Sequence, residues 1–110
     1  MQRVHPNDVV DRLVTGCSEI AGHLDLFEGA DVVMSQVGYL LRDGVLSHDA
    51  AAYVFRVLNR LAKRGEPLVE NVLEVLVSTP SGIAMSRRAL TGRALAMFEA
   101  LVVAWPRRRH

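Results

Sequence analysis

Apolar side chains return every three or four residues along almost the whole chain, and this spacing constrains the fold more than any other feature of the sequence. Such spacing gathers apolar groups on one face of a helix, which must then be buried against another helix. No region shows the apolar–polar alternation that demands a strand. Because the chain has 110 residues, 50% of them hydrophobic, we predict a single all-α domain.

The first predicted helix covers residues 7–22, with Cys17 at the centre of its apolar stripe. A lone Cys in that position is typical of a small, buried and unreactive side chain. The next helix is expected to have Asp31 as its N-cap, because a carboxylate can accept hydrogen bonds from unpaired backbone N–H groups. It is expected to end before Gly44, which can adopt the left-handed conformation.

Capping signals continue in the second half of the chain. Ser47 is predicted to cap a third helix that stops at Gly65. A fourth helix is expected to start at Pro67 and to end at Thr79, and it is so apolar that we expect it to pack on two or more sides. Residues 81–90 are compatible with either a short helix or a turn.

The last helix is expected to run from a Thr91 cap to Pro106, which should stop it. This places one helical domain at residues 1–106 and a mobile basic tail at residues 107–110. We therefore expect five or six short helices joined by short turns, with successive helices roughly antiparallel. Either a compact bundle or a HEAT- or armadillo-like stack of helical hairpins satisfies this pattern.

The sequence lacks the motifs of common catalytic and cofactor sites. It contains no glycine-rich phosphate loop and no nucleophile elbow, and its single Cys cannot form an internal disulfide. The one cluster of metal-ligand types is His23, Asp25 and Glu28, which we interpret as solvated linker residues. No secretory signal or membrane-spanning segment is visible. These features predict a cytoplasmic protein that is not an enzyme and binds no cofactor or metal.

Charge is divided unevenly along the chain. Residues 1–55 hold three Arg and eight Asp or Glu, a net charge of −5, and residues 56–110 hold ten Lys or Arg and four Glu, a net charge of +6. Such a division can steer a charged partner. The simpler interpretation, which we favour, is that folding brings the halves together and largely neutralises them.

Two surfaces are candidates for binding a partner. The first is a charged face on the third and fourth helices, where partial pairing between the helices is expected: Arg56, Arg60, Lys63, Glu70 and Glu74. The second is the last helix, on which Glu99 is the only charged residue between Arg93 and Pro106. Its predicted anchors are large apolar side chains: Met97, Val103 and Trp105. Residues 83–90 or a second molecule could cover its apolar outer face.

The run AAYVFRVLNRLAKRGEPLVENVLEVLVSTP, followed by SRRALTGRALAMFEALVVAW, resembles a group of short uncharacterised bacterial helical proteins, some of which occur in toxin–immunity settings. The resemblance covers roughly residues 47–105. Its pattern comprises a few spaced residues: Asn59, Leu61, Asn71, Glu74, Phe98, Glu99 and Trp105. The resemblance implies a HEAT-like fold and a binding role without catalysis, and it supplies no catalytic residues.

These observations predict a non-catalytic module that binds another protein, such as an immunity or antitoxin-like inhibitor of a toxin, or that self-associates through its last helix. The alternative is a small DNA-binding regulator that uses the helices at 47–64 and 67–79, with Arg56 and Arg60 facing the phosphates. Against this alternative, the second of these helices would offer Glu70 and Glu74 to the phosphates.

Overall fold

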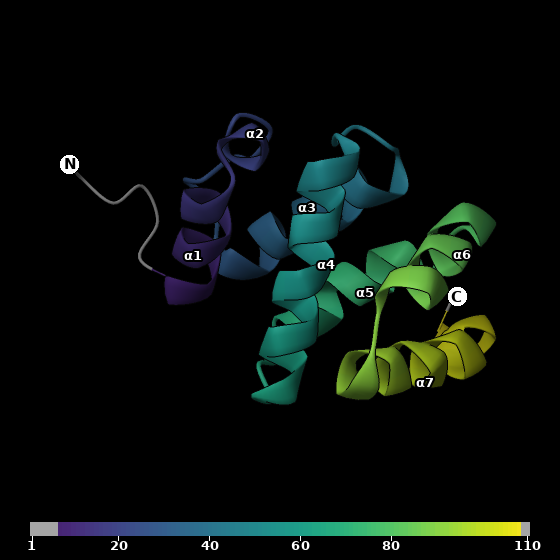
Figure 1. Cartoon of the computed structure of the whole chain (residues 1–110). Coiled ribbons are helices and arrows are strands. Elements are labelled where there is room, and N and C mark those ends of the chain that lie inside the picture. Colours follow the sequence, from purple (N-terminus) through teal and green to yellow (C-terminus); the bar gives the residue numbers. More distant parts are fainter. Residues whose placement is uncertain (1–6, 109–110) are drawn as a thin grey trace.

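The chain folds into α-helices joined by short turns (Figure 1). The structure, a computed structural model, describes the backbone of residues 7–108 and the side chains of residues 7–105. Within that range there are seven helices and no strand, which confirms the predicted all-α class. The helices are α1 (Asp8–Gly16), α2 (Ser18–Ala21), α3 (Ala30–Arg42), α4 (His48–Lys63), α5 (Val69–Leu76), α6 (Pro80–Ala89) and α7 (Gly92–Arg108).

The prediction of one continuous helix over residues 7–22 is wrong, because the structure breaks this segment into α1 and α2. The backbone of Cys17 is extended (φ −153°, ψ 102°), and its side chain is half-buried between the two helices. Glycine favours a helix poorly, and Gly16 also leaves room for Tyr53, whose hydroxyl a Cβ at this position would overlap. The Tyr53 hydroxyl donates a hydrogen bond to the Arg12 carbonyl (2.9 Å), which ties α4 to α1 at the break.

Helix α3 makes its main packing contact with α5 rather than with its neighbour α4. Gly38 allows this close approach, because a Cβ built there would lie 2.8 Å from the Val75 Cβ and 3.0 Å from the Val72 carbonyl oxygen. Helix α4 crosses in front of this pair (Figure 1). The expected antiparallel pairing of successive helices therefore fails at α3 and α4, and a stack of helical hairpins is not confirmed.

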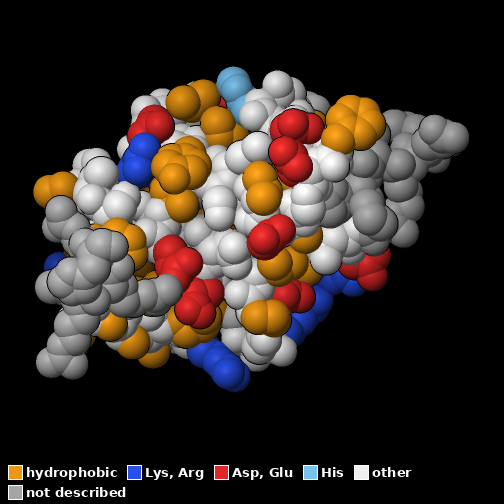
Figure 2. All heavy atoms as spheres, turned by 180° about the vertical axis from the view of Figure 1, so that it is seen from behind, with side chains coloured by type: hydrophobic (Ala, Val, Ile, Leu, Met, Phe, Trp, Pro, Cys, Tyr) orange, Lys and Arg blue, Asp and Glu red, His pale blue; other side chains and the backbone are white. Residues whose placement is uncertain are grey.

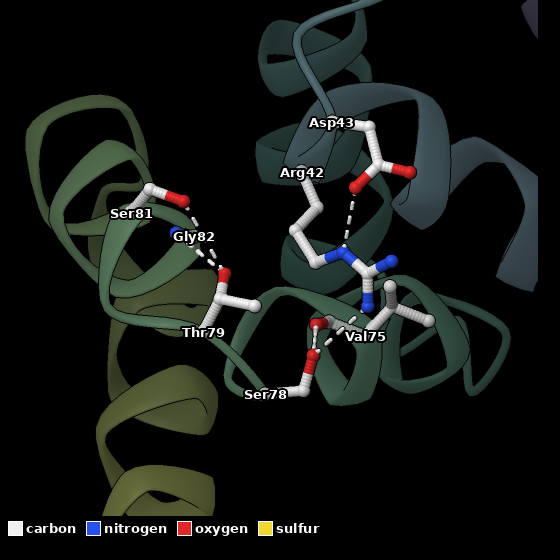
Figure 3. A network of polar contacts seen from close by, with 7 residues as sticks. All are labelled: Arg42, Asp43, Val75, Ser78, Thr79, Ser81 and Gly82. Carbon is white, nitrogen blue, oxygen red and sulfur yellow. Dashed lines mark hydrogen bonds and ion pairs between the residues drawn. The ribbon is translucent and has the colours of Figure 1, made fainter.

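Side-chain contacts at both ends of the α3–α5 pair indicate that the two helices run in roughly the same direction. Near their starts, the Asn71 amide donates to the Asp31 carbonyl (3.4 Å). Near their ends, the Arg42 guanidinium donates to the Ser78 hydroxyl (3.3 Å) and pairs with Asp43 (2.9 Å; Figure 3). Because these contacts lie at both ends of the pair, they fix how α3 and α5 lie against each other.

Several predicted helix ends are confirmed. The Ser47 hydroxyl accepts a hydrogen bond from the Ala50 N–H (3.2 Å) and caps α4. Gly44 and Gly65 have positive φ angles of 68° and 81°, the conformation expected after the last turn of a helix. Each of these signals determines a helix end from residues within a few positions of it. The predicted ends are therefore kept when the helices pack together.

Two other ends differ from the prediction. Helix α3 begins at Ala30 without a side-chain cap, so Asp31 is a first-turn residue, where its charge still favours the positive helix end. Helix α5 is shorter than predicted: it begins after Pro67, at Val69, and ends before Thr79, at Leu76. The Glu66 carboxylate accepts a hydrogen bond from the Leu68 N–H (3.1 Å) in the preceding turn, which delays the start of α5.

Residues 81–90, which the sequence left open, belong almost entirely to α6. The Thr79 hydroxyl caps this helix by accepting a hydrogen bond from the Gly82 N–H (3.1 Å; Figure 3). Helix α7 continues through Pro106 to Arg108, so the prediction that Pro106 stops it is wrong. Proline fits the φ angle of a helix, so the helical backbone can continue past it although its N–H is missing and its ring crowds the preceding turn. Residues 109 and 110 of the predicted tail lie outside the described residues.

The core lies where α1, α3, α4, α5 and α7 meet. Its largest fully buried side chains come from all these helices and from α2: Phe98, Leu13, Ile20, Met34, Leu41, Leu58, Leu73 and Leu76. Helix α5 contacts both α3 and α7, which confirms the predicted two-sided packing. None of the helices in residues 7–108 has both the length and the apolar character that crossing a bilayer requires.

Candidate functional site

Of the charged residues predicted to bind a partner, two line hollows, and these hollows are different ones. Arg56, Arg60 and Lys63 are exposed along α4, whereas Glu70 is exposed and Glu74 half-buried on α5. Arg60 lines a hollow between α1 and α4, and Glu70 lines another between α5 and α7. No ion pair joins Arg60 to Glu70, so these two residues do not contribute to the expected pairing of the two helices through their charges.

The α5–α7 groove has a volume of about 330 Å³ and is lined by one acid and four apolar side chains: Glu70, Met97, Ala100, Leu101 and Ala104. Val103 stands three residues after Ala100 on α7 and is 80% exposed, but it does not line the groove. Of the three predicted anchors, only Met97 therefore lines the groove. The third, Trp105, is half-buried against the core.

The chain covers α7 on some sides only. Its inner residues Ala94, Phe98 and Leu101 are buried. On the α6 side, the Arg87 guanidinium forms two hydrogen bonds with the Glu99 carboxylate (2.8 and 2.9 Å) and holds the pKa of that carboxyl below its ordinary value. The flank that faces the α5–α7 groove carries no such contact at Ala100, which is exposed. Cover by the chain itself is thus incomplete on this flank.

The α1–α4 groove is the second hollow, and its charged residues are all arginines. It has a volume of about 110 Å³ and is lined by Val9, Arg12, Tyr53, Val57, Arg60, Leu61 and Arg64. An adjoining hollow of about 310 Å³ shares four of these residues and adds Asp8, Gly65, Glu66 and Pro67. Of its three arginines, sequence reasoning found only Arg60. The spacing of Arg60 and Arg64 on one helix face was visible, but Arg12 joins them only through the packing of α1.

Tyr53 forms part of the wall of the α1–α4 groove. Burial raises the pKa of its hydroxyl above the ordinary value, although the nearby Arg60 and Arg56 cations act in the opposite direction. The hydroxyl therefore stays protonated at neutral pH and serves as the donor to the Arg12 carbonyl. Tyr53 holds the two helices together rather than supplying a reactive phenolate.

A third hollow, between α4 and α6, has a volume of about 330 Å³ and a mostly apolar lining: His48, Ala51, Ala52, Phe55, Met85, Arg88 and Ala89. The linker residues His23, Asp25 and Glu28 are exposed and lie elsewhere. Across the part of the chain whose side chains are described, no three His, Cys, Asp or Glu side chains are grouped as metal ligands would be.

The face opposite α4 carries a different balance of charge. Figure 2 shows it with acidic side chains spread among apolar ones, while Lys and Arg lie mainly toward its edges. Asp31 of α3 and Glu70 of α5 are exposed, and on α4 the exposed cations include Arg56 and Lys63. On the face drawn in Figure 2, acids therefore stand among apolar side chains with few cations between them, and neutralisation of the two halves stays a prediction.

The helices proposed for DNA binding differ in how far they are exposed. Helix α5 packs between α3 and α7, and its apolar residues are buried. Its exposed side chain Glu70 is an acid, which disfavours contact with DNA phosphates. Helix α4 exposes its cations, but it is followed by a helix and not by the β-wing that a winged motif needs.

Comparison of the chain with protein-family models, with curated proteins and with solved structures returned no match. The resemblance to short bacterial helical proteins therefore stays a prediction, and the arguments below rest on this chain's own residues.

Proposed function

We propose that this chain is a non-catalytic protein-binding module whose α5–α7 groove holds an apolar segment of another protein that bears a Lys or Arg. The observation that carries this proposal is the open flank of α7. Met97 lines a groove there, Val103 lies on the same helix and is 80% exposed, and Glu70 is the one charged residue that lines the groove. Large apolar groups at the centre of a contact supply most of its binding energy.

The chemistry of the groove favours a different protein over a second copy of this chain. Glu70 calls for a cation on the partner, because an acid facing an apolar surface loses its hydration without gaining a charge partner. A copied α7 would bring Glu99, the only charge between Arg93 and Pro106, and this acid is already paired with Arg87, so it supplies no cation for Glu70. A segment with apolar residues and one Lys or Arg satisfies both requirements of the groove.

Apolar burial on this flank would contribute part of the affinity of such a contact. Burying an exposed Val side chain contributes about 1.5 kcal/mol, and Met97 and Ala100 would add to this. The charge pair at Glu70 adds orientation and selectivity more than affinity. A concrete form of this function is an immunity or antitoxin-like inhibitor that covers the working surface of a toxin.

Peptide display tests the chemistry of the partner directly. We expect the chain to select helical peptides that combine apolar residues with Lys or Arg, and Glu70→Lys should shift the selection toward acidic peptides. Ala100→Asp should weaken the selected peptides about ten-fold, because it places an acid in the groove. Ala84→Asp, the same change at an exposed position of α6, should leave binding unchanged.

Three results would overturn the proposal. The first is selection of no peptide, and the second is equal loss of binding in Ala100→Asp and Ala84→Asp. The third is a dimer, seen by sedimentation, that Ala100→Asp dissociates, since the occupant of the groove would then be a second copy. Co-purification with the product of an adjacent gene, lost in Ala100→Asp, would support the inhibitor form, and failure to bind any such product would count against it.

A further inference from the structure

We propose that the α1–α4 groove binds a multivalent oxyanion, of the phosphate or pyrophosphate class, through the guanidinium groups of Arg12, Arg60 and Arg64. This site lies apart from the α5–α7 groove and is independent of the proposed function. Three arginines from α1 and from the end of α4 line one small hollow.

These three arginines lack carboxylate partners among the residues whose side chains are described. The two acids nearby, Asp8 and Glu66, line only the adjoining hollow. The Glu66 carboxylate already accepts a hydrogen bond from the Leu68 N–H. The lining of the α1–α4 groove therefore includes three arginines and no acid, and Arg12 and Arg64 also line the adjoining hollow with Asp8 and Glu66.

A hollow lined by one sign of charge concentrates the electric field and attracts an ion of the opposite sign. Arg12, Arg60 and Arg64 are exposed, so their guanidinium groups are accessible to an anion that enters from solvent. Arginine suits an oxyanion because its planar fork can donate two parallel hydrogen bonds to two oxygens. Arg12 belongs to α1 and Arg60 to α4, so the two guanidinium groups reach the groove from different helices.

The groove also has a firm base and a suitable size. Val9, Val57 and Leu61 are each less than 10% exposed and form its apolar floor. The Tyr53–Arg12 hydrogen bond (2.9 Å) fixes the distance between its two helices. Its volume of about 110 Å³ is several times the ~10–15 Å³ that one water requires, so a small oxyanion with some of its water fits.

A small anion fits these observations better than a nucleic acid does. The three arginines surround a hollow between two helices, whereas a duplex needs cations spread along an open surface. Arg56 and Lys63 are exposed on the same helix, but neither lines the groove. They therefore offer a way to separate the two classes of ligand.

Calorimetric titration with sodium pyrophosphate tests the site. We expect a saturable 1:1 signal in the intact chain and about ten-fold weaker binding in Arg12→Gln and in Arg60→Gln, since a hydrogen bond to a charged group is worth about 1.5–3 kcal/mol. The matched control is Arg93→Gln, which removes the same charge from an exposed position on α7 and should change affinity less than two-fold. Unchanged melting curves would show that the variants are folded.

The source of the phosphate is distinguished by a second titration with ADP. Tighter binding of ADP than of pyrophosphate would indicate a nucleotide, and equal binding a free ion. The site is refuted if pyrophosphate does not bind, or if Arg93→Gln weakens it as much as Arg60→Gln. Retention on duplex DNA that Arg56→Gln and Lys63→Gln reduce as much as Arg60→Gln does would replace the anion site with a nucleic-acid face.

Discussion

Replacement of Gly38 by Ala tests the packing that holds α3 against α5. The added Cβ would lie 2.8 Å from the Val75 Cβ and 3.0 Å from the Val72 carbonyl oxygen, closer than such atoms can rest. Overpacking of this kind costs about 1–3 kcal/mol. Alanine has a better helix propensity than glycine, which offsets about 1 kcal/mol of this cost. Because the new Cβ would also meet the Val72 carbonyl oxygen, we expect the steric cost to lie near the upper end of this range. We expect a net loss of about 2 kcal/mol.

Urea unfolding followed by far-UV circular dichroism measures this loss. The midpoint should fall while the dependence on urea stays the same, and the melting temperature should drop by about 10 °C for a chain of this size. Gly22→Ala is the matched control, because its Cβ would meet nothing closer than the Glu19 carbonyl oxygen at 3.9 Å. It should be neutral or slightly stabilising. If Gly38→Ala were as stable as Gly22→Ala, the close contact of α3 with α5 would be wrong.

Three further predictions concern contacts between distant elements. Hydrogen bonds from the Ser47 N–H and hydroxyl (both 2.7 Å) lower the pKa of the Glu19 carboxyl, so this contact stabilises the fold above the ordinary pKa of 4.5 and is lost as the pH falls through the lower folded value. Acid unfolding curves should therefore show a weaker dependence on pH below about 4.5 in Glu19→Gln. Asn59→Ala removes the bonds to the Ala89 carbonyl (3.2 Å) and from the Thr91 N–H (2.9 Å), and it should lower the unfolding free energy by about 1–3 kcal/mol in urea; a loss below 0.5 kcal/mol would contradict this role. Tyr53→Phe removes only the hydroxyl that bonds Arg12, and calorimetric melting should show a loss of about 1 kcal/mol, whereas unchanged melting would mean that this bond does not join α4 to α1.

Sequence reasoning succeeded where the cause of a structure is local. Ser47 and Gly65 stand within one turn of the helix ends that they define, and both were predicted. The break after Gly16 was missed because Tyr53, which occupies the space beside Gly16, reaches it only after α4 has folded against α1. The predicted end of the last helix at Pro106 was wrong because a proline often marks a helix end but does not prevent the helix from continuing.

The candidate sites divide in the same way. Met97 and Val103 were found from the apolar run of α7, because the pattern itself indicates a face that needs cover. Helix α6 covers the Glu99 side of α7 and leaves the Ala100 side open. This difference depends on tertiary packing, which the sequence pattern of α7 does not show. The α1–α4 groove was missed for the same reason, because Arg12 belongs to an acidic part of the sequence and joins Arg60 only in the folded chain.

The two asparagines of the resemblance pattern have structural roles in this fold. Asn59 joins α4 to the turn between α6 and α7, and Asn71 joins α5 to the start of α3. A side-chain amide can both donate and accept, which suits it to joining backbone groups of separate elements. Their spacing in the sequence thus reflects contacts between helices, and it needs no ligand to explain it.

The most direct test of the binding function is to map a selected basic–apolar peptide onto the chain by amide chemical shifts. The account predicts that the shifts gather at Glu70, Ala100 and Ala104, while Ala84 on α6 does not move. Shifts centred on α4, or spread evenly over the molecule, would contradict the assignment of the α5–α7 groove as the place where a partner docks.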